Sequence, residues 1–443
     1  MAQLTPAAAE PDGVERLRRL VSPYTGIVHR LHEAMLEPDD SRHARFECEL
    51  ASTQTTIGVP DPPPAGGSGA TRDAAIGAAL GEALERYAGL CLPPEHETIL
   101  ATAAEIGPAA VTPERFALFS ESQYGRPGFA FTPFTERTRI RWVPGRSIPD
   151  GEPVYLPLQL AYIWRQSELA DGEEAIAPGT SSGMAAGLTQ DDAILGGLLE
   201  LVERDAVMLT WANRLRHPRV DGSSDPELVA IEQAYFRPSG VSYEVADLSV
   251  FFGIPTALAV IRGGASGFGI GASSAATMAE AWHKALRECF QVRTTLKRDL
   301  LANPDPAFDG PDAVETFLDH ARYYADPRLQ EETRFLTGAP PVTATGSFPR
   351  IDGQTSGERL AAVAGRLGDR GVSAYWVDIA PPDIREAGLH AVSVISPELQ
   401  PLDAAYRHRF LGGHRLRFAA FELGLLEAPL DEADLNPLPH PFA

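Results

Sequence analysis

The 443-residue sequence is poor in cysteine, with only Cys48, Cys91 and Cys289. These three lack the close spacing of zinc ligands, and they are too few for a disulfide framework. Long apolar runs are also absent. No stretch approaches membrane-spanning length, and the first 20 residues lack the apolar centre of a signal peptide. The sequence therefore predicts a cytoplasmic protein with reduced thiols and no membrane partner.

Positive charge is scarce as well. The sequence has 38 Lys and Arg residues against 60 Asp and Glu residues, which gives a net charge of −22 at pH 7. This balance argues against nonspecific binding to nucleic acid or to anionic membranes. Length alone would allow about two to four domain-sized units around a large core. An internal repeat favours one composite domain instead.

The repeat is one short pattern that occurs three times. It reads AIGAALGEALERY from Ala75, AILGGLLELVERD from Ala193 and AWHKALRECFQVR from Ala281. Each copy has a glutamate seven residues after the first alanine, and Glu or Gln follows three residues later. Helical positions i and i+3 share a face. Each copy therefore predicts one pair of neighbouring side chains, namely Glu82 with Glu85, Glu200 with Glu203, and Glu288 with Gln291.

These pairs lie in helices that are otherwise rich in Ala and Leu, where an unpaired carboxylate is costly to bury. If the three helices converge, their carboxylates repel one another unless cations lie between them. Mg²⁺ prefers such oxygen ligands and also binds phosphate. A single copy could be an ordinary amphipathic helix with exposed glutamates. Three matched copies favour a magnesium site instead.

Glycine-rich segments precede all three helices, and we expect each to form a turn that leads into its helix, at Gly66–Gly69, Gly179–Gly183 and Gly267–Gly271. Backbone N–H groups at a helix start favour an anion, and glycine allows the anion to approach closely. The alternative is glycine in ordinary tight turns. None of the segments matches a P-loop or the dinucleotide-binding fingerprint. Together with the acidic helices, they predict an unusual nucleoside triphosphate site with Mg²⁺ between phosphates and glutamates.

Strand-like stretches alternate with the helices, which predicts an α/β fold of sheets with packed helices. The expected strands cover 27–31, 45–50, 140–143, 154–156, two strands within 241–262, 374–380, and a stretch near 392–402; a short helix is expected near 14–20. We expect an N-terminal segment over 1–60 and a catalytic domain over 61–443. Within that domain, 301–355 reads as a peripheral, variable insertion and 435–443 as a proline-rich tail.

The three motifs resemble those of the YcaO superfamily. ALGEALERYAG is similar to its first nucleotide-binding motif, and the stretch SSGMAAGLTQDDAILGGLLELVERDAVMLTW to its second. GIGASSAATMAEAWHKALRECFQVR is similar to the third, and the likeness extends from about residue 22 to 443. The resemblance implies a YcaO-type fold in which the repeat helices form an ATP site with Mg²⁺. It also implies that ATP activates a peptide backbone amide.

The resemblance assigns roles residue by residue. It implies that Glu82, Glu85, Glu200 and Glu203 bind Mg²⁺ or its phosphate cluster. Arg204 and Lys284 would contact phosphates, Glu288 and Gln291 would complete the site, and Ser182 would contact the nucleotide. Two positions depart from the family pattern. Ala78 stands where the family often has a serine, and Arg72 would replace a lysine that is common before the first helix.

The sequence ends in LNPLPHPFA, which contains Pro437, Pro439 and Pro441. By composition such a tail is a disordered end or a polyproline II ligand. Within the resembled family, a terminal PxPxP marks members that form azoline heterocycles. The resemblance therefore implies a cyclodehydratase that converts Cys, Ser or Thr of a ribosomal precursor peptide into thiazoline or oxazoline. The expected catalytic residues are the three prolines and Gln291, and His440 is the histidine to examine.

The family also implies partners. Fused relatives carry an N-terminal E1-like region that binds the leader of the precursor peptide, and about 60 residues before the first motif are too few for it. We expect a separate E1-like partner, a homodimer, and a flavin-dependent azoline dehydrogenase as an optional further partner. A thioamide- or amidine-forming relative and a non-catalytic nucleotide-binding scaffold remain as alternatives. The sequence leaves open the preference between Cys and Ser or Thr, and any later oxidation.

Overall fold

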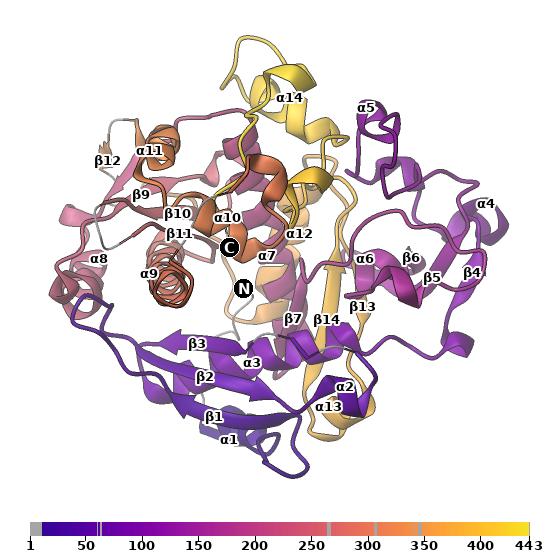
Figure 1. The fold of residues 1–443 in the computed structure, drawn as a ribbon, viewed down its shortest axis with the longest axis horizontal. Coiled ribbons are helices and arrows are strands. Elements are labelled where there is room, and N and C mark those ends of the chain that lie inside the picture. Colours follow the sequence, from indigo (N-terminus) through magenta and orange to yellow (C-terminus); the bar gives the residue numbers. More distant parts are fainter. Residues whose placement is uncertain are drawn as a thin grey trace. The chain divides into compact units, whose positions relative to one another are not determined.

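A computed structural model describes residues 11–59, 61–62, 64–263, 267–304, 308–339, 341–343 and 348–442. The chain forms two compact units (Figure 1). Unit 1 comprises 1–35, 43–201 and 353–398, and unit 2 comprises 36–42, 202–352 and 399–443. The expected boundary at residue 60 does not coincide with this division. Among the described residues, no helix is both long and apolar enough to cross a membrane.

Unit 1 contains a three-stranded antiparallel sheet in the order β1-β2-β3. Its strands are β1 (Val28–Glu33), β2 (Ala44–Leu50) and β3 (Ala65–Gly69). Helix α3 (Arg72–Leu90) packs on β3 and β2, and α1 (Pro11–Arg18) packs on α3. Gly67 makes this packing close, because a Cβ there would lie 2.1 Å from the backbone N of Ala79. A strand residue with any side chain would push the helix away.

The second sheet of unit 1 has the order β4-β5-β13-β14-β7, with β6 paired to β5. Its strands are β4 (Ile99–Ala101), β5 (Ile140–Ser147), β6 (Pro153–Pro157), β7 (Met184–Gly187), β13 (Tyr375–Asp378) and β14 (His390–Ile395). The other helices of this unit are α2 (Thr53–Thr56), α4 (Ala103–Ile106), α5 (Glu121–Tyr124), α6 (Leu158–Ala161), α12 (Ser356–Gly368) and α13 (Pro382–Glu386). Residues of both sheets and of α3 share one apolar core, with Leu80, Val143 and Val377 among its buried members.

Unit 2 contains a five-stranded sheet in the order β11-β10-β9-β8-β12. Its strands are β8 (Arg219–Asp221), β9 (Glu244–Asp247), β10 (Thr256–Ile261), β11 (Gly269–Ser274) and β12 (Pro341–Thr343). Helix α9 (Met278–Ala302) packs on β11 and β10, and its apolar face joins the core through Trp282, Leu286 and Phe290. The other helices are α8 (Pro226–Ile231), α10 (Phe317–Tyr323), α11 (Pro327–Gln330) and α14 (His414–Glu422).

The internal repeat is larger than the sequence indicates, because a strand precedes each repeat helix. The three units are β3–α3, β7–α7 (Gln190–Ala212) and β11–α9. The expectation that Gly66–Gly69 and Gly267–Gly271 form turns at helix starts is wrong for Gly66–Gly69 and for Gly269–Gly271, which lie in strands. Their glycines serve close packing: a Cβ on Gly271 would lie 2.4 Å from the backbone N of Cys289 on α9. Gly183 does lie in a turn, with a φ of 79°, but β7 follows it.

Most expected elements are present, with shifted ends. The strands expected at 27–31, 45–50, 140–143, 154–156 and 374–380 correspond to β1, β2, β5, β6 and β13, and 241–262 holds β9 and β10. The stretch near 392–402 is a strand only as far as Ile395. The short helix expected near 14–20 is α1, which begins and ends earlier.

The connection between β1 and β2 contains residues 36–42, which belong to unit 2 and bind to α9. The fully buried Arg293 forms an ion pair with Asp39, and Lys297 forms ion pairs with Glu37 and Asp39. Thr294 donates to Asp40 over 2.7 Å. These contacts hold the second half of α9 in place, so the residues of its first half are presented by a fixed helix.

Candidate active site

Three of the four glutamates assigned to Mg²⁺ lie together in unit 1. Glu82 and Glu85 are on α3 and Glu200 is on α7, and each is less than a tenth exposed. Glu82 accepts from the N–H of Gly66 over 3.1 Å and pairs with Arg86 over 2.5 Å. Glu85 accepts from the N–H of Ala186, on β7, over 3.1 Å. Neighbouring strands of the repeat thus orient both carboxylates of α3.

The group carries excess negative charge. Burial, and then the negative charge of Glu200, raise the pKa of the Glu85 carboxyl well above its ordinary value, and Glu82 adds to the effect. Like charges that are forced together in this way take up either a proton or a cation. The carboxylates do not form a compact cage. Among the described residues, only His320, Asp403 and His440 form a group of three whose potential ligand atoms all lie within 4.8 Å of one another.

The fourth glutamate, Glu203, lies in unit 2 with the residues assigned on α9. It follows Glu200 by three residues, and α7 is one continuous helix across the boundary between the units. Lys284 is half-buried, and the charges of Glu203 and Glu288 reach its ammonium group. Burial and the nearby Arg287 nevertheless lower the pKa of Lys284. Unit 2 therefore places basic and acidic groups side by side.

Arg287 is a residue that the motif assignment missed. It lies three residues after Lys284 and one before Glu288, on the same face of α9. Its guanidinium is buried, and Nε and Nη2 have no hydrogen-bond partner among the described residues. Burial lowers its pKa to about 10, although Glu288 opposes this. Gln291 lies one turn further along α9. Its side-chain oxygen Oε1 is also buried and has no hydrogen-bond partner among the residues that the structure describes.

Unpaired buried donors are costly and mark places where a ligand completes the hydrogen bonds. The face of α9 with Lys284, Arg287, Glu288 and Gln291 offers cationic N–H groups together with oxygen ligands. A guanidinium suits phosphate oxygens, and carboxylate and amide oxygens suit Mg²⁺. The donor set therefore fits a magnesium-bound nucleoside phosphate. Helical spacing from Lys284 is the signal that could have identified Arg287 in the sequence.

The two departures from the family pattern both lie in unit 1. Ala78 is buried on α3, so the expected hydroxyl is absent there. On β3, two residues after Gly66, the buried hydroxyl of Ser68 lacks a hydrogen-bond partner within the described ranges and is a candidate replacement. Arg72 forms an ion pair with Glu33, and its guanidinium lies 5.2 Å from the ring centre of Phe46.

Ser182 lies in unit 1, in the turn before β7. It is half-buried, and its N–H donates to the hydroxyl of Thr180 over 3.4 Å. This contact uses the backbone of Ser182 and shapes the turn. The assignment of a nucleotide contact to Ser182 stays a prediction.

The proline-rich tail is ordered in unit 2 up to Phe442, and Ala443 lies outside the described residues. Pro439 and Pro441 are buried, whereas Pro437 is exposed. His440 is buried, and burial lowers its pKa; the charge of Arg204 is a smaller factor in the same direction. The tail therefore lies near the arginine that was assigned to phosphate.

The stretch 301–355 contributes to the same region. Helix α10 lies within it, and His320, Ala321 and Tyr324 are buried there. This part of the stretch is therefore not peripheral. The expectation that the stretch varies between relatives stays a prediction.

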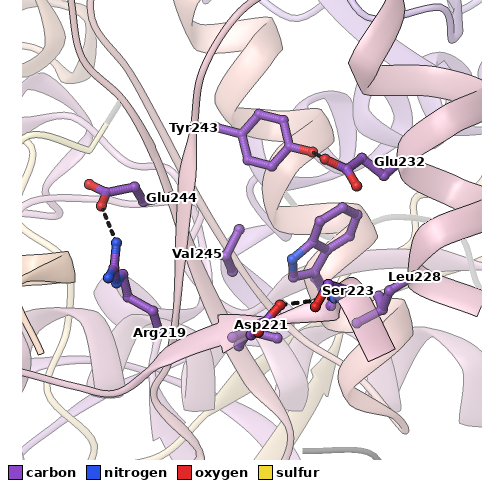
Figure 2. A pocket seen from close by; sticks show the side chains of 11 residues that line it. Arg219, Asp221, Ser223, Leu228, Glu232, Tyr243, Glu244 and Val245 are labelled. Atoms are coloured by element: carbon purple, nitrogen blue, oxygen red, sulfur yellow. Dashed lines mark hydrogen bonds and ion pairs between the residues drawn. The ribbon is translucent and has the colours of Figure 1, made fainter. Parts of the chain in front are cut away.

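A separate pocket of about 360 Å³ lies on the β8 and β9 side of unit 2 (Figure 2). Its walls carry hydrogen-bonded pairs, Tyr243 with Glu232 and Arg219 with Glu244, both at 2.9 Å. Trp282 of α9 also lines it. None of the residues assigned to nucleotide or metal lines this pocket.

The fold has counterparts among solved structures. A heterocyclase in complex with substrate and cofactor matches with a TM-score of 0.80 and 28% identity, over 97% of this chain and 56% of that chain. The heterocyclase TruD matches with a TM-score of 0.69 and 25% identity, over 97% of this chain and 54% of its own. YcaO from Methanopyrus kandleri, bound with AMPPCP and Mg²⁺, has the same fold, with a TM-score of 0.60 at 19% identity over 88% and 89% of the two chains.

The chain spans little more than half the length of the two heterocyclases. Two curated sequence relatives are uncharacterized proteins. One, from Rhizobium leguminosarum bv. trifolii, is 35% identical over 28% of this chain and 30% of its own length. The other, from Methanothermobacter thermautotrophicus, is 28% identical over 44% of this chain and 46% of its own.

A family model matches residues 66–400, a span that contains all three repeat helices. The model describes the YcaO cyclodehydratases that bind ATP and Mg²⁺. The match covers well over half of the sequence. The chain belongs to the YcaO cyclodehydratase family.

Proposed function

We propose that this protein is an ATP-dependent cyclodehydratase that forms azoline rings in a ribosomal precursor peptide. The observation that carries the proposal is the buried acidic group of Glu82, Glu85 and Glu200, in which burial and then like charge raise the pKa of Glu85. Such a group of like charges destabilises the fold unless cations neutralise it. Its placement on the family's motif helices supports a role in nucleotide-dependent chemistry.

In the proposed reaction, a Cys thiol or a Ser or Thr hydroxyl adds to the preceding carbonyl carbon. The oxyanion receives the γ-phosphoryl group of ATP, whose bond to the β-phosphate breaks to release ADP. The C–O bond of the former carbonyl then breaks with loss of inorganic phosphate. Protons leave from the nucleophile and from the amide nitrogen, so the peptide loses one water. ATP supplies the phosphoryl group that makes the amide oxygen a leaving group, with Mg²⁺ screening its charge.

The chain's own residues divide this work by charge. Glu82, Glu85, Glu200 and Glu203 are the proposed Mg²⁺ ligands, since ionised carboxylates are hard oxygen ligands. Arg204, Lys284 and Arg287 are the proposed phosphate contacts, with Glu288 and Gln291 alongside. Basic groups that are already held in place stabilise transferred charge without reorganisation.

The ordered tail supports the azoline-forming branch. The proximity of His440 to Arg204 fits a tail that orders the reacting centre. We expect deletion of residues 437–443 to lower cyclisation by orders of magnitude while nucleotide binding falls much less. Normal cyclisation by the truncated protein would remove this support.

We propose a separate E1-like protein as the partner that recruits the precursor peptide. One of the similar solved structures is a heterocyclase bound to its substrate and cofactor, and this chain spans 56% of it. Weak activity alone and strong stimulation by the E1-like partner are expected. Full-speed, leader-dependent cyclisation by the purified chain alone would contradict the idea.

The test of the function is mass spectrometry of a precursor peptide that is incubated with this chain, ATP, Mg²⁺ and the E1-like partner. We expect loss of one water per modified residue, dependent on ATP. Glu200→Gln and Glu203→Gln should retain the fold, by circular dichroism, and abolish ATP turnover, because neutral amides hold Mg²⁺ weakly. Glu386→Gln, at an exposed glutamate, is the matched control. Exchange of oxygen for sulfur in the peptide would redirect the assignment to thioamide formation.

A further inference from the structure

The tail is bound through its carbonyl groups. Five consecutive backbone carbonyls, from Asn436 to His440, each accept a hydrogen bond from a different side chain of unit 2. In tail order the donors are Arg409 at 2.8 Å, Tyr406, Trp211 at 3.1 Å, Tyr324 at 2.6 Å and the ring of His320 at 2.7 Å. These donors come from three separate stretches of the sequence, at Trp211, at 320–324 and at 406–409. A disordered end has no such set of partners.

The sequence of the tail segment, residues 436–442, explains why carbonyls carry the contacts. Proline has no N–H, so Pro437, Pro439 and Pro441 offer only acceptors. The N–H of Leu438 donates to the side chain of Asn436 over 3.3 Å, and that of Phe442 donates to Nδ1 of His440 over 3.2 Å. The segment thus satisfies these two donors internally and requires side-chain donors from its surroundings.

Asn436 anchors the start of the segment to the end of α7. Its backbone N–H donates to the carbonyl of Ala212 over 2.8 Å, and its side chain donates to the carbonyl of Trp211 over 3.2 Å. The last carbonyls of a helix lack partners within the helix. The segment therefore caps the helix that carries Glu203 and Arg204, and its position is coupled to theirs through one rigid element.

Aromatic rings line the place where the segment binds. Trp211 and Tyr324 meet edge to face at 5.9 Å between ring centres, and Phe335 and Phe268 pack on them at 5.5 Å. Aromatic walls with N–H and O–H donors are the chemistry by which unrelated domains bind polyproline II peptides. Proline restricts the free peptide, so little conformational entropy is lost on binding.

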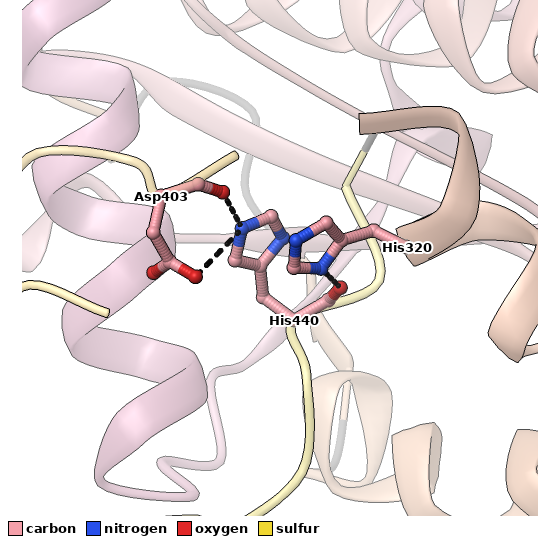
Figure 3. A group of neighbouring side chains, drawn as sticks. All are labelled: His320, Asp403 and His440. Atoms are coloured by element: carbon pink, nitrogen blue, oxygen red, sulfur yellow. Dashed lines mark hydrogen bonds and ion pairs between the residues drawn. The ribbon is translucent and has the colours of Figure 1, made fainter. Parts of the chain in front are cut away.

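His320 and His440 close the far end of this site (Figure 3). Their rings stack in parallel, with 3.8 Å between centres and 5° between planes. His440 donates from Nε2 to the carbonyl of Asp403 over 2.7 Å. Although the ligand atoms of these three residues are close, one ion cannot lie in two parallel ring planes 3.8 Å apart. The group holds the tail and is not arranged as a metal site.

From these contacts we infer that unit 2 contains a built-in receptor for a proline-rich peptide, and that its occupant is the tail segment of this chain. The receptor residues are Trp211, His320, Tyr324, Tyr406 and Arg409, which act as positioning residues. Recognition combines carbonyl acceptors spaced by prolines with the stacked ring of His440. The claim that the receptor matters for the reaction rests on the proposed function. The claim that the receptor binds the tail segment does not depend on that function.

The test compares two adjacent tyrosines of the full chain. Tyr324→Phe removes the hydroxyl that donates to Pro439, and Tyr323→Phe is the matched control, since no bond from Tyr323 to the tail occurs among the described residues. By hydrogen–deuterium exchange, we expect the amides of Leu438 and Phe442 to exchange at least about tenfold faster in Tyr324→Phe than in wild type. Tyr323→Phe should match wild type. Equal exchange in all three proteins would overturn the proposal.

A second measurement supplies the segment in trans. A chain that ends at residue 435, with its fold checked by circular dichroism, should bind the labelled peptide Asn-Pro-Leu-Pro-His-Pro-Phe-Ala in fluorescence anisotropy. The same peptide with its prolines changed to alanine should bind at least about tenfold more weakly. If the proposed function also holds, the peptide restores cyclisation. Binding without restored activity would contradict the function alone, and no binding to a folded chain would contradict the receptor.

Discussion

Burial raises the pKa of Glu85 on α3, and Glu200 of α7 lies close enough in unit 1 for its charge to raise that pKa further. The raised pKa favours the protonated form of Glu85, whereas a bound cation favours its ionised form. Proton and Mg²⁺ therefore compete for the same group of carboxylates.

We expect Mg²⁺-dependent nucleotide binding to strengthen as pH rises through the range in which Glu85 titrates. Calorimetry in buffers of different ionisation enthalpy should show proton release on binding of a non-hydrolysable ATP analogue with Mg²⁺. Glu85→Gln should abolish the release, because its amide carries no such proton. An unchanged proton release in Glu85→Gln would show that the proton comes from another group.

Strand and helix lie close together in each repeat, so a side chain added to a glycine at this contact should lower the stability of the protein. Gly271→Ala should destabilise the protein by about 3 kcal/mol or more, because the new Cβ would lie 2.4 Å from the backbone N of Cys289 and 2.5 Å from the carbonyl oxygen of Ala285. Gly365→Ala is the control, since it lies within α12 with no atom near its Cβ position. It should stabilise by up to about 1 kcal/mol. Urea unfolding measures both, and equal effects would contradict the packing argument.

The sequence identifies what depends on local spacing. The two Glu–Glu pairs, the Glu288–Gln291 pair and the family follow from residues within one helix at a time, and all three helices are present in the structure. The glycine-rich strands were not identified, because segments such as Gly269–Ser274 contain no alternation of large apolar and polar side chains. Glycine serves turns and close packing alike, and only the position of the helix distinguishes the two.

The receptor for the tail depends on long-range contacts. His320 and His440 are 120 residues apart in the sequence, and α10 has no motif that refers to the tail. Arg287 was missed for a different reason: it lies inside a recognised motif at a position to which the resemblance assigns no role. Its burial without partners for Nε and Nη2 is visible only in three dimensions.

The buried carboxyl of Asp403, beside His440, makes the stability of unit 2 depend on pH. Burial raises the pKa of Asp403 to about 7, although Arg409 opposes this. The fold therefore favours the protonated form of Asp403. The contribution of Asp403 to the free energy of unfolding is complete below 3.8, the ordinary pKa of the group, and is lost as pH rises through about 7. Burial lowers the pKa of His320 to about 4, so its contribution increases with pH between about 4 and 6.5 and partly hides the loss.

Asp403→Asn separates the two effects. Relative to wild type, its free energy of unfolding should rise with pH by about 1.4 kcal/mol per unit until Asp403 is ionised. Urea unfolding between pH 4.5 and 8 measures this, with Glu427→Gln at an exposed glutamate as the control. A difference between Asp403→Asn and wild type that does not change with pH would contradict the raised pKa.

Arg287 offers a test in which stability and function move in opposite directions. Its guanidinium is buried, and two of its nitrogens lack hydrogen-bond partners among the described residues, which is a cost to the ligand-free fold. Arg287→Met keeps an apolar stem of similar length and removes the charge. We expect the ligand-free variant to be more stable by about 1–3 kcal/mol, which is a rise of a few degrees in Tm.

The same variant, Arg287→Met, should bind ATP more weakly. We expect the KM for ATP to rise at least about tenfold, and the Tm increase caused by ATP analogue and Mg²⁺ to shrink, because a charge-assisted phosphate contact is gone. Arg287→Lys retains the charge but not the bidentate geometry, so its KM for ATP should lie between those of wild type and Arg287→Met. A less stable Arg287→Met with an unchanged KM would mean that Arg287 serves packing alone. A more stable variant that binds nucleotide weakly would identify Arg287 as a ligand-binding group held ready by α9.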